Sequence, residues 1–415
     1  MKILHVNKYA YRRGGAESYA IDVAELQRGR GHEVELFGME HPENPPLRYE
    51  NSFAPLIELD PPPPGIAGQI TTAVKMVHNR SAATALAAVL DDFKPDVVHH
   101  HNIYHQLSPS ILRPIKERGI TNVMTLHDYK LACPNYRMLD GEEPCRACID
   151  GSRLSPIKKR CNRGSLSASV VVAVESMIHH RTNAYGPVDA FICPSHFMAD
   201  VMSDAGIDAD RLHRIPHFSL ASEIDQDAEL DQPKTGVVFA GRLSSEKGVA
   251  TLIEAAHLMP DVRFTIAGDG PDKAELEKQA AAGPGDVVFT GRLSRQELQE
   301  VQIASAVTAV PSRWFENQPM IVLESYSVGT PVVASDMGGL SELIDDGVDG
   351  ALVPHSDPKA LAAALARYTS DSDLAATEGR RGAKRIAADH DVDGHLDELE
   401  RLYHSLRERA EGVKQ

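Results

Sequence analysis

The chain lacks any apolar run long enough to cross a membrane. Its longest strongly apolar stretch, Ala168 to Val174, ends at Glu175 and falls well short of the roughly 18 residues that a spanning helix requires. The N-terminus leads straight into a strand-like segment, KILHVN, so no signal peptide is expected. These absences predict a cytoplasmic protein.

The chain also lacks an excess of positive charge. It has 43 Lys and Arg against 59 Asp and Glu, and the net charge of -16 argues against general nucleic-acid binding through phosphate neutralisation. An anionic partner must therefore meet a local basic patch. One basic cluster could contact an anionic membrane at its inner face, although an ordinary solvated loop would look the same. It consists of Arg153, Lys158, Lys159, Arg160 and Arg163.

Two common nucleotide-binding patterns are missing. A dinucleotide-binding loop needs three spaced glycines and an acid after the second strand, but neither RGGAE at 13–17 nor GDGPDK at 268–273 has the third glycine. The Gly-Lys-Ser/Thr ending of phosphate-loop nucleotidases occurs nowhere. A Rossmann oxidoreductase is therefore disfavoured, and a phosphate-loop enzyme is set aside. The paired Gly14 and Gly15 still allow backbone to approach a phosphate or sugar closely, or form a tight structural turn.

What the chain does contain is a regular alternation of short β-branched runs and helix-like stretches. This pattern predicts an α/β fold with parallel sheets covered on both faces, and 415 residues suggest two domains. The acidic stretch between Phe218 and Gly236 is the expected linker. We therefore expect an N-terminal domain over 1–218 with a cysteine-containing insertion near 130–164, a C-terminal domain over 219–394, and an amphipathic helix over 395–415 that could cap either domain.

Two acids eight positions apart, Glu316 and Glu324, bracket the predicted start of a helix. Pro319 suits the first turn, and the apolar run after it would form the body of the helix. Free backbone N–H groups from Asn317 and Gln318 onward would form a phosphate site, because the donors and the helix dipole both favour an anion. Carboxylates beside such a site should bind hydroxyls, which suggests a nucleotide sugar. An exposed loop acid and an ordinary helix acid are the plain alternative.

Cations follow two other predicted strands. Arg242 and Lys247, in GRLSSEKG, could neutralise a diphosphate without any metal, although each could be a surface charge. VVFAGRLS at 237–244 and VVFTGRLS at 287–294 differ at one position, and we interpret them as two strand ends of one sheet that deliver a Gly and an Arg to its ligand-binding edge. Alternatively, the two segments are similar by chance and their arginines have only structural roles.

Histidines end two further predicted strands. His127 closes NVMTLHD, and His99, His100 and His101 with Asn102 close DVVHHHN. Imidazoles there can donate to hydroxyls or support charge, yet a lone histidine is more often a satisfied structural group. Alternation places His99 and His101 on one face and His100 on the other, so at most two of the three share a role.

Together these motifs resemble a retaining glycosyltransferase of family 4, with the two-domain fold called GT-B, in which two Rossmann-like domains face each other across a cleft. The resemblance covers nearly the whole chain. It rests on the Glu-x7-Glu element from Glu316 to Glu324, the GTPVVAS strand, the GGLSELI turn, the GGAE loop and GRLSSEKG. It departs from many relatives at IPHF (215–218), where an Asn-Gly or Asn-Phe pair is usual, which puts the hinge or cleft edge around His217 in question.

The resemblance implies roles for single residues. Glu316 would contact the donor sugar, Glu324 the ribose hydroxyls, and His127 the sugar near its reacting face. Arg242 and Lys247 would hold the diphosphate and, with His127 and Glu316, would form the catalytic set. Further donor contacts would come from Gly14, Gly15, Gly270, Arg292, Leu293, Asn317, Gln318, Pro319, Met320, Ile321 and Val322. The acceptor would lie in the N-terminal domain near Glu17, His99, His101 and Asn102.

The implied activity is transfer of a sugar from a nucleotide diphosphate sugar, such as a UDP-sugar or GDP-sugar, to a hydroxyl acceptor. The acceptor would be a glycan, a lipid-linked glycan or a small molecule, in polysaccharide, glycolipid or cell-envelope glycan biosynthesis. The family's chemistry is metal-independent, so no cofactor is expected for catalysis. The alternatives are a nucleotide-sugar epimerase or phosphorylase on the same fold, or a sensor that binds a nucleotide sugar without transfer.

Four of the five cysteines have a spacing that could close a tetrahedral structural zinc site. They are Cys133, Cys145, Cys148 and Cys161, with a single true Cys-x-x-Cys pair at 145 and 148. Reduced free thiols are an equal alternative, and disulfides are disfavoured in the cytosol. Such a zinc would organise the insertion between His127 and Gly164, which we expect beside the acceptor.

Overall fold

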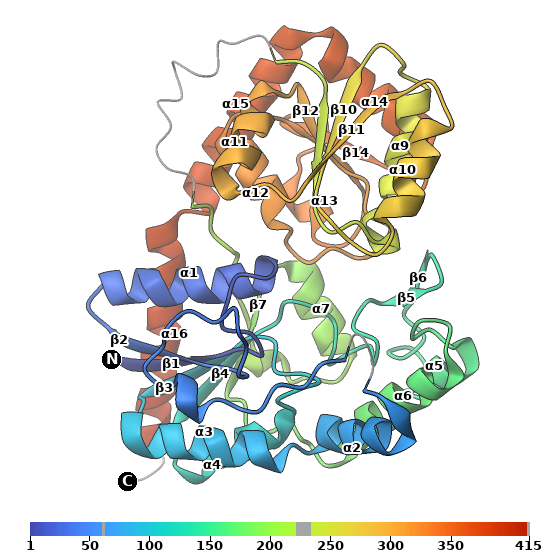
Figure 1. Ribbon diagram of the computed structural model, residues 1–415. Helices are drawn as coiled ribbons and strands as arrows, with labels where there is room; N and C mark the ends of the chain where they lie inside the picture. The colour runs from blue at the N-terminus through green and yellow to red at the C-terminus, as the bar shows by residue number, and fades with distance from the viewer. Residues whose placement is uncertain (60–62, 221–233, 413–415) are drawn as a thin grey trace.

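The computed structural model describes residues 1–59, 63–220 and 234–412, and it contains two six-stranded parallel sheets, one in each half of the molecule (Figure 1). Most of the expected linker, 221–233, lies outside the described residues. The predicted α/β fold with two Rossmann-like units is confirmed.

The first sheet has the strand order β2-β1-β3-β4-β7-β8, and every neighbouring pair is parallel. The chain starts in β1, moves outward to β2 and crosses back to β3, so the strand order reverses between β1 and β3. Ligands of open α/β sheets collect at the carboxyl ends beside such a reversal. The strands are β1 (Lys2–Val6), β2 (Glu33–Phe37), β3 (Val97–His100), β4 (Thr121–Thr125), β7 (Ala190–Cys193) and β8 (Leu212–Arg214).

The second sheet repeats this plan with the order β11-β10-β9-β12-β13-β14, again with parallel pairing. Its order reverses between β9 and β12, and the segments after these two strands carry GRLSSEKG and the acid that begins the Glu-x7-Glu element. The strands are β9 (Val237–Ala240), β10 (Arg263–Ala267), β11 (Asp286–Gly291), β12 (Val307–Val310), β13 (Val332–Ser335) and β14 (Gly350–Val353).

Helices cover both sheets because short apolar strands, buried on both faces, need cover on each side. Around the first sheet lie α1 (Gly15–Gly29), α2 (Gly65–Val77), α3 (Arg80–Phe93), α4 (Leu112–Glu117), α5 (Ser155–Lys159), α6 (Leu166–Arg181) and α7 (His196–Asp204). Around the second lie α9 (Val249–His257), α10 (Lys273–Ala281), α11 (Arg295–Ala304), α12 (Met320–Ser327), α13 (Leu340–Leu343), α14 (Pro358–Ser370) and α15 (Ser372–Asp389). The insertion contains a short hairpin, β5 (Leu139–Asp140) and β6 (Glu143–Pro144).

The last helix, α16 (Val392–Gly412), returns to the first half of the molecule (Figure 1). Its leucine stripe and Tyr403 join the core formed with β1, β3 and α1, where Leu399 and Tyr403 are fully buried. The Tyr19 hydroxyl on α1 lies 2.9 Å from His395 Nε2. The sequence showed that this helix must pack on something, and the structure shows that it covers the N-terminal sheet.

Candidate functional site

The N-terminus of α12 presents free backbone donors, as expected. Pro319 is the residue before the helix, with extended backbone at φ −71° and ψ 123°. Val322 N–H donates to Pro319 O at 3.1 Å. The amides of Met320 and Ile321 have no acceptor within the described parts of the chain. These two N–H groups, at the positive end of the helix dipole, can bind an anion.

Glu316 lies just before this helix and is buried, with 4% exposure. Its Oε1 accepts hydrogen bonds from Lys247 Nζ at 2.7 Å and from Ser312 Oγ at 2.6 Å. Its backbone oxygen accepts from Gly339 N–H at 2.7 Å and from the Tyr129 hydroxyl at 3.2 Å. The carboxylate therefore has a fixed position beside the predicted diphosphate cation, and the backbone of Glu316 contacts the first half of the molecule through Tyr129.

Glycines bring the cation loop against the strand that precedes α12. Gly248 has a φ of +69°, and a Cβ there would lie 1.8 Å from Pro311 O, so only glycine permits this approach. Lys247, next to it, is thereby held on Glu316, with Nζ 5.0 Å from the Trp314 ring centroid. Gly270 serves the same loop: a Cβ there would lie 2.2 Å from Leu243 O. Close backbone packing therefore already requires this glycine, whatever it contributes to a ligand.

The other predicted cations lie at the same edge of the second sheet but are more exposed. Arg242 follows β9, and no ion pair holds its side chain within the described residues. Arg292 and Leu293 follow β11, the outermost strand, two strands away from β9. The similar segments 237–244 and 287–294 therefore do belong to one sheet, but only the first stands at the reversal of strand order.

Glu324 lies on α12 and is half-buried. Burial raises the pKa of its carboxyl, Arg295 lowers it, and Asp22 on α1 raises it further. A half-buried acid without a cation in direct contact is suited to accept hydrogen bonds from ligand hydroxyls.

The side chains of Asn317 and Gln318 join the two halves. Asn317 Nδ2 donates to Leu126 O at 2.9 Å, and its Oδ1 accepts from Ser195 Oγ at 2.9 Å. Gln318 Oε1 accepts from His217 N–H at 2.5 Å. Both side-chain atoms of Asn317 and the Oε1 of Gln318 are therefore engaged within the protein, and the unusual IPHF segment provides one side of this junction.

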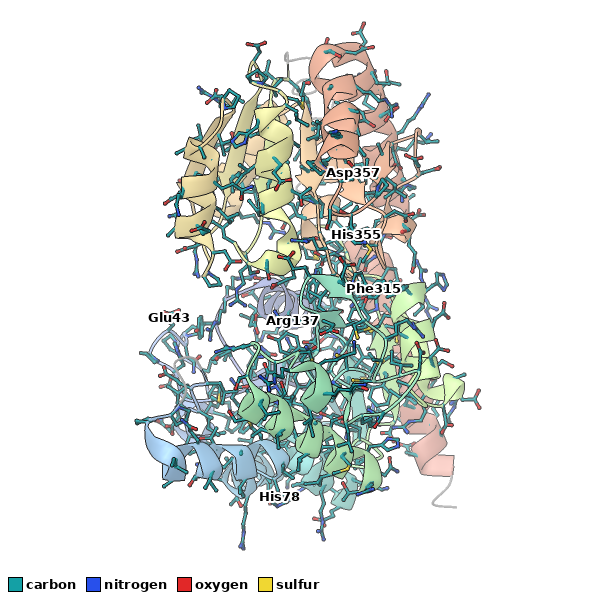
Figure 2. All side chains as sticks on the ribbon, turned by 90° about the vertical axis from the view of Figure 1, so that its right-hand side faces the viewer. Glu43, His78, Arg137, Phe315, His355 and Asp357 are labelled. Carbon is teal, nitrogen blue, oxygen red and sulfur yellow. The ribbon has the colours of Figure 1, made fainter. Side chains whose placement is uncertain are left out.

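Other contacts across the junction could not have been found from sequence motifs. Glu342 accepts hydrogen bonds from the first amides of α7, His196 N–H at 2.8 Å and Phe197 N–H at 2.6 Å. Arg137 and Glu246 approach to 3.8 Å. Figure 2 shows Arg137 and Phe315 where the two halves meet. Glu342 belongs to the GGLSELI turn, but no short motif reveals its partner, because the two residues of each pair are far apart in sequence.

His127 ends a line of hydrogen-bonded imidazoles. Its Nε2 lies 3.1 Å from His101 Nδ1, His101 Nε2 lies 3.0 Å from His5 Nδ1, and His5 Nε2 lies 2.8 Å from Gln27 Oε1. Burial lowers the pKa of His127 to about 3 and that of His5 to about 4, so both rings are neutral at physiological pH. Each neutral imidazole has one donor and one acceptor nitrogen.

The orientation of Gln27 therefore fixes every tautomer in this line. Because Gln27 Oε1 only accepts, His5 Nε2 must donate to it, His101 Nε2 must donate to His5, and His127 Nε2 must donate to His101. His127 Nδ1 is then left as an acceptor. The predicted sugar-contacting residue would accept a hydrogen bond from a hydroxyl, not donate one.

The residues predicted to bind the acceptor substrate are buried more deeply than the sequence suggested. His99 is fully buried, with Nδ1 2.7 Å from the Tyr403 hydroxyl and Nε2 2.7 Å from Thr125 Oγ1. It stacks on His101 at 4.5 Å, as strand alternation predicted. His99 has no nitrogen free for a ligand, because α16 covers this side of the sheet.

Asn102 is also held within the protein, since its Oδ1 accepts from the Tyr104 hydroxyl at 3.0 Å and its N–H donates to Asn7 Oδ1 at 2.9 Å. The loop before α1 is more open. Gly14 and Gly15 are exposed, and a Cβ at Gly15 would meet nothing within 4 Å. Glu17, in the first turn of α1, is 7% exposed.

The four cysteines of the insertion influence one another. A hydrogen bond with Cys148 lowers the pKa of the Cys133 thiol to about 7, and the same contact raises the pKa of Cys148, with Cys161 and Cys145 adding to the rise. No three of the four sulfurs lie within 4.8 Å of one another. In the described regions only His5, His99 and His101 bring three such ligand atoms together, and their nitrogens are already hydrogen-bonded.

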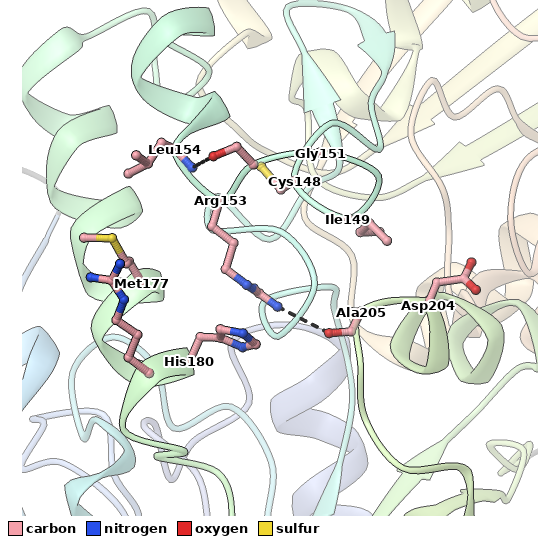
Figure 3. Close-up of a pocket in the computed structure, with 11 residues that line it drawn as sticks. Cys148, Ile149, Gly151, Arg153, Leu154, Met177, His180, Asp204 and Ala205 are labelled. Carbon is pink, nitrogen blue, oxygen red and sulfur yellow. Dashed lines mark hydrogen bonds between the residues drawn. The ribbon is translucent and has the colours of Figure 1, made fainter.

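A pocket of about 480 Å³ lies between the insertion, α6 and α7 (Figure 3). Arg153 crosses it and donates to Ala205 O at 3.3 Å. Leu154, Ile149 and Met177 supply apolar walls. None of the predicted donor residues lines this pocket, so it is separate from the site at α12.

The chain matches two family models that together span nearly all of it. Residues 13–218 match Glycosyltransferase Family 4, and residues 221–385 match Glycosyl transferases group 1. With the paired Rossmann-like units and the site at the second reversal point, these matches show that the chain belongs to the glycosyltransferases of family 4, with the GT-B fold.

Individual relatives agree with this class. Alpha-D-kanosaminyltransferase of Streptomyces kanamyceticus is 31% identical over 220 residues, 49% of this chain and 56% of the relative, so the match spans about half of that protein. Alpha-maltose-1-phosphate synthase of Mycolicibacterium smegmatis is 27% identical over 412 residues, 90% of each chain.

Solved structures share the fold. Sucrose-phosphate synthase from Thermosynechococcus elongatus superposes with a TM-score of 0.71 at 20% identity, covering 98% of both chains. Anabaena Alr3699/HepE, solved in complex with UDP-glucose, has a TM-score of 0.65 at 20% identity, covering 98% of this chain and all of that one.

Proposed function

We propose that this protein transfers a sugar from a nucleotide diphosphate sugar to a hydroxyl acceptor, with retention of the anomeric configuration and without a metal in the chemical step. The observation that carries the proposal is the Lys247–Glu316 pair beside the free amides of α12. A cation, a helix N-terminus and the Glu316 carboxylate lie together there, with Glu324 further along α12, which suits a ligand with both phosphates and hydroxyls. The relative crystallised with UDP-glucose supports this ligand class.

Each residue has a distinct role in this proposal. Lys247, Arg242 and the amides of Met320 and Ile321 bind the diphosphate. Glu324 binds the ribose hydroxyls. In the reaction, the bond from the anomeric carbon to the phosphate oxygen breaks while the acceptor oxygen bonds to that carbon on the same face. The departing phosphate oxygen takes the acceptor's proton, and the cations stabilise its growing charge.

Two contacts set the sugar in place. Glu316 would accept hydrogen bonds from the donor sugar, and His127 would accept one through Nδ1 near the reacting face. Gly14 and Gly15 would let the loop before α1 close on the diphosphate, since open space surrounds Gly15. The donor would thus be held between both halves of the molecule, which suits closure over the ligand.

A panel of nucleotide sugars, scored by thermal stabilisation, tests donor binding. One donor should raise the melting temperature, and Lys247→Ala should remove the shift. Turnover of that donor should continue with a chelator present, and NMR of the product should show the donor's anomeric configuration. Conversion of one nucleotide sugar into another in the absence of an acceptor would indicate an epimerase. If no donor stabilises the protein, the proposal is overturned.

We further propose that the four cysteines of the insertion hold a structural zinc ion. Cys133, with a pKa of about 7, is readily ionised, and its thiolate raises the pKa of Cys148 and Cys161, a repulsion that a divalent cation would relieve. Binding would need the loops to draw the sulfurs together. Elemental analysis should find zinc in freshly purified protein and in Cys193→Ala but not in Cys148→Ser. Absence of zinc from the unmodified protein would end this proposal.

We also propose glycan or lipid-linked glycan acceptors, in polysaccharide, glycolipid or cell-envelope glycan synthesis at the inner face of a membrane. Among the described helices, none has the length and apolar character to span a bilayer. Any membrane association through these helices would therefore be peripheral.

A further inference from the structure

One face of the N-terminal half carries apolar side chains toward solvent. On α2, Ile66 is 78% exposed, and Ile70 and Val74 are each 60% exposed. Their spacing of four residues aligns them along one side of the helix. Only Met76 of this helix is buried. Helix α2 therefore turns its apolar stripe outward, the reverse of a normal surface helix.

The neighbouring α6 has a matching stripe. Leu166, Val170 and Val174 follow the same spacing, with exposures of 47%, 37% and 36%. The two helices pack against each other, and the ring of His179 on α6 donates from Nε2 to Val77 O at 3.0 Å. We call the six residues Ile66, Ile70, Val74, Leu166, Val170 and Val174 the α2–α6 face. Figure 1 shows both helices at the end of the N-terminal half opposite the second sheet.

The charge around this face differs from that of the rest of the chain. The chain has 59 Asp and Glu, yet residues 63–90 and 151–174 contain none. The same two segments contain seven cations: Lys75, Arg80, Arg153, Lys158, Lys159, Arg160 and Arg163. Lys158 and Arg160 are exposed at the end of α5, which packs on α6. Lys159 pairs with Asp140 at 2.5 Å.

We propose that the α2–α6 face docks on an anionic lipid bilayer. Aliphatic side chains flanked by cations fit the boundary between acyl chains and anionic headgroups. On the C-terminal half, exposed aliphatic residues such as Leu258 and Val348 lie on separate elements, without such a stripe. A soluble anionic polymer would engage the cations but leave the six aliphatic side chains in water.

The insertion links this face to the candidate donor site. Lys130 follows the His127 segment and donates to Glu175 of α6 at 2.8 Å, and Glu142 in the β5–β6 hairpin pairs with Arg313 at 2.7 Å, close to Glu316 in sequence. A docked bilayer would therefore lie at one end of the insertion and the donor at the other. This indicates a membrane-bound, lipid-linked acceptor, a consequence that rests on the proposed function, whereas the docking itself does not.

Vesicle co-sedimentation of the full chain tests the docking. Vesicles of phosphatidylcholine alone are compared with vesicles that also contain phosphatidylglycerol. The protein should bind the anionic vesicles and release them at high salt. The variant Ile66→Ser, Ile70→Ser, Val74→Ser should bind at least about tenfold more weakly, and so should Lys158→Glu, Arg160→Glu. The matched controls Leu258→Ser, Val348→Ser and Lys278→Glu alter exposed residues of the other half and should bind normally.

The docking would be overturned if the folded protein did not bind anionic vesicles, or if the α2 variant bound them as well as its control does. It would also be overturned if a soluble anionic glycan displaced the protein from the vesicles while the α2 substitutions had no effect. If the α2 substitutions instead dissociate a dimer in sedimentation velocity, the face is a contact between copies of this chain. Donor-induced thermal stabilisation, measured on the same samples, reports separately on the proposed function.

Discussion

Lys247 Nζ and Glu316 Oε1 lie 2.7 Å apart, and this ion pair joins the loop after β9 to the loop after β12. The Lys247 side chain is 24% exposed and that of Glu316 is 5% exposed, so the cation is the member of the pair that a ligand reaches first. A bound diphosphate would share Lys247 with Glu316 and draw the lysine toward the negative charge that develops on the leaving group.

Lys247→Ala should lower turnover about a hundredfold or more, comparable with the loss of one transition-state donor. Lys247→Arg keeps the charge and should recover part of the activity. Lys278→Ala, on exposed α10, is the matched control and should leave kcat and KM unchanged. Steady-state kinetics on folded variants checks this, and an intact turnover rate in Lys247→Ala would show that the phosphate assignment is wrong.

Glu324 should distinguish ribose from deoxyribose. The protein should bind a nucleoside diphosphate more tightly than its 2′-deoxy counterpart, by about 10- to 100-fold, because a carboxylate hydrogen bond is lost. Glu324→Ala should abolish that preference while leaving binding of the deoxy ligand nearly unchanged. Isothermal titration calorimetry measures all four affinities. If Glu324→Ala still prefers the ribose ligand over the deoxyribose ligand, another residue must contact the ribose.

The same residue gives a pH dependence. Burial raises the pKa of Glu324, so its carboxylate is protonated at a higher pH than usual as the solution is acidified. Nucleotide affinity should be constant above that pKa and should fall as pH falls through it. Glu324→Gln cannot titrate and should lack this step. Equal pH profiles for the unmodified protein and Glu324→Gln would show that Glu324 does not contribute to ligand binding.

Gln27 should control the tautomer of His127 through His5 and His101. Gln27→Met removes the acceptor that orients the line, so His127 should lose its single Nε2–H tautomer. Nitrogen-15 NMR of the imidazoles reads the tautomer without any ligand. Gln302→Met alters another buried glutamine, in the second half, and should leave the His127 signals unchanged. An unaltered His127 tautomer in Gln27→Met would contradict the hydrogen-bond order.

Glu175 should contribute to acid stability. Although burial raises its pKa, Lys130 and His105 lower it to about 2, and their nitrogens both lie 2.8 Å from the carboxylate. A depressed carboxyl pKa stabilises the fold above the ordinary value of 4.5, and that stability is lost as pH falls toward 2. The shift corresponds to roughly 3 kcal/mol. Urea unfolding should show a steeper loss between neutral and acidic pH for the unmodified protein than for Glu175→Gln. Matching acid profiles would count against this contribution.

The sequence predicted the sheets because strands are short local runs whose apolar character shows directly in the chain. It also placed GRLSSEKG after a strand and Glu316 at the start of a helix, and the structure brings these together because both follow strands at the reversal point of the second sheet. The ion pair itself could not be predicted, since it depends on Gly248 packing against Pro311.

The histidines show the limit of the same reasoning. Alternation correctly placed His99 and His101 on one side of their strand, but a strand pattern gives the side and not the depth. The depth of His99 is set by Tyr403, 304 residues later, on a helix whose partner the leucine stripe did not specify. Contacts of this kind depend on tertiary packing and leave no local signal.

The most direct test of the account is acceptor-dependent release of nucleoside diphosphate. The donor that stabilises the protein most is incubated with a membrane lipid extract as the source of acceptor, alongside Lys247→Ala and Lys278→Ala. Release should require the extract, should fall about a hundredfold in Lys247→Ala and should be normal in Lys278→Ala. If the protein binds the donor tightly but releases no nucleoside diphosphate, with the extract or with any soluble acceptor, it is a nucleotide-sugar sensor and the proposed transfer is contradicted.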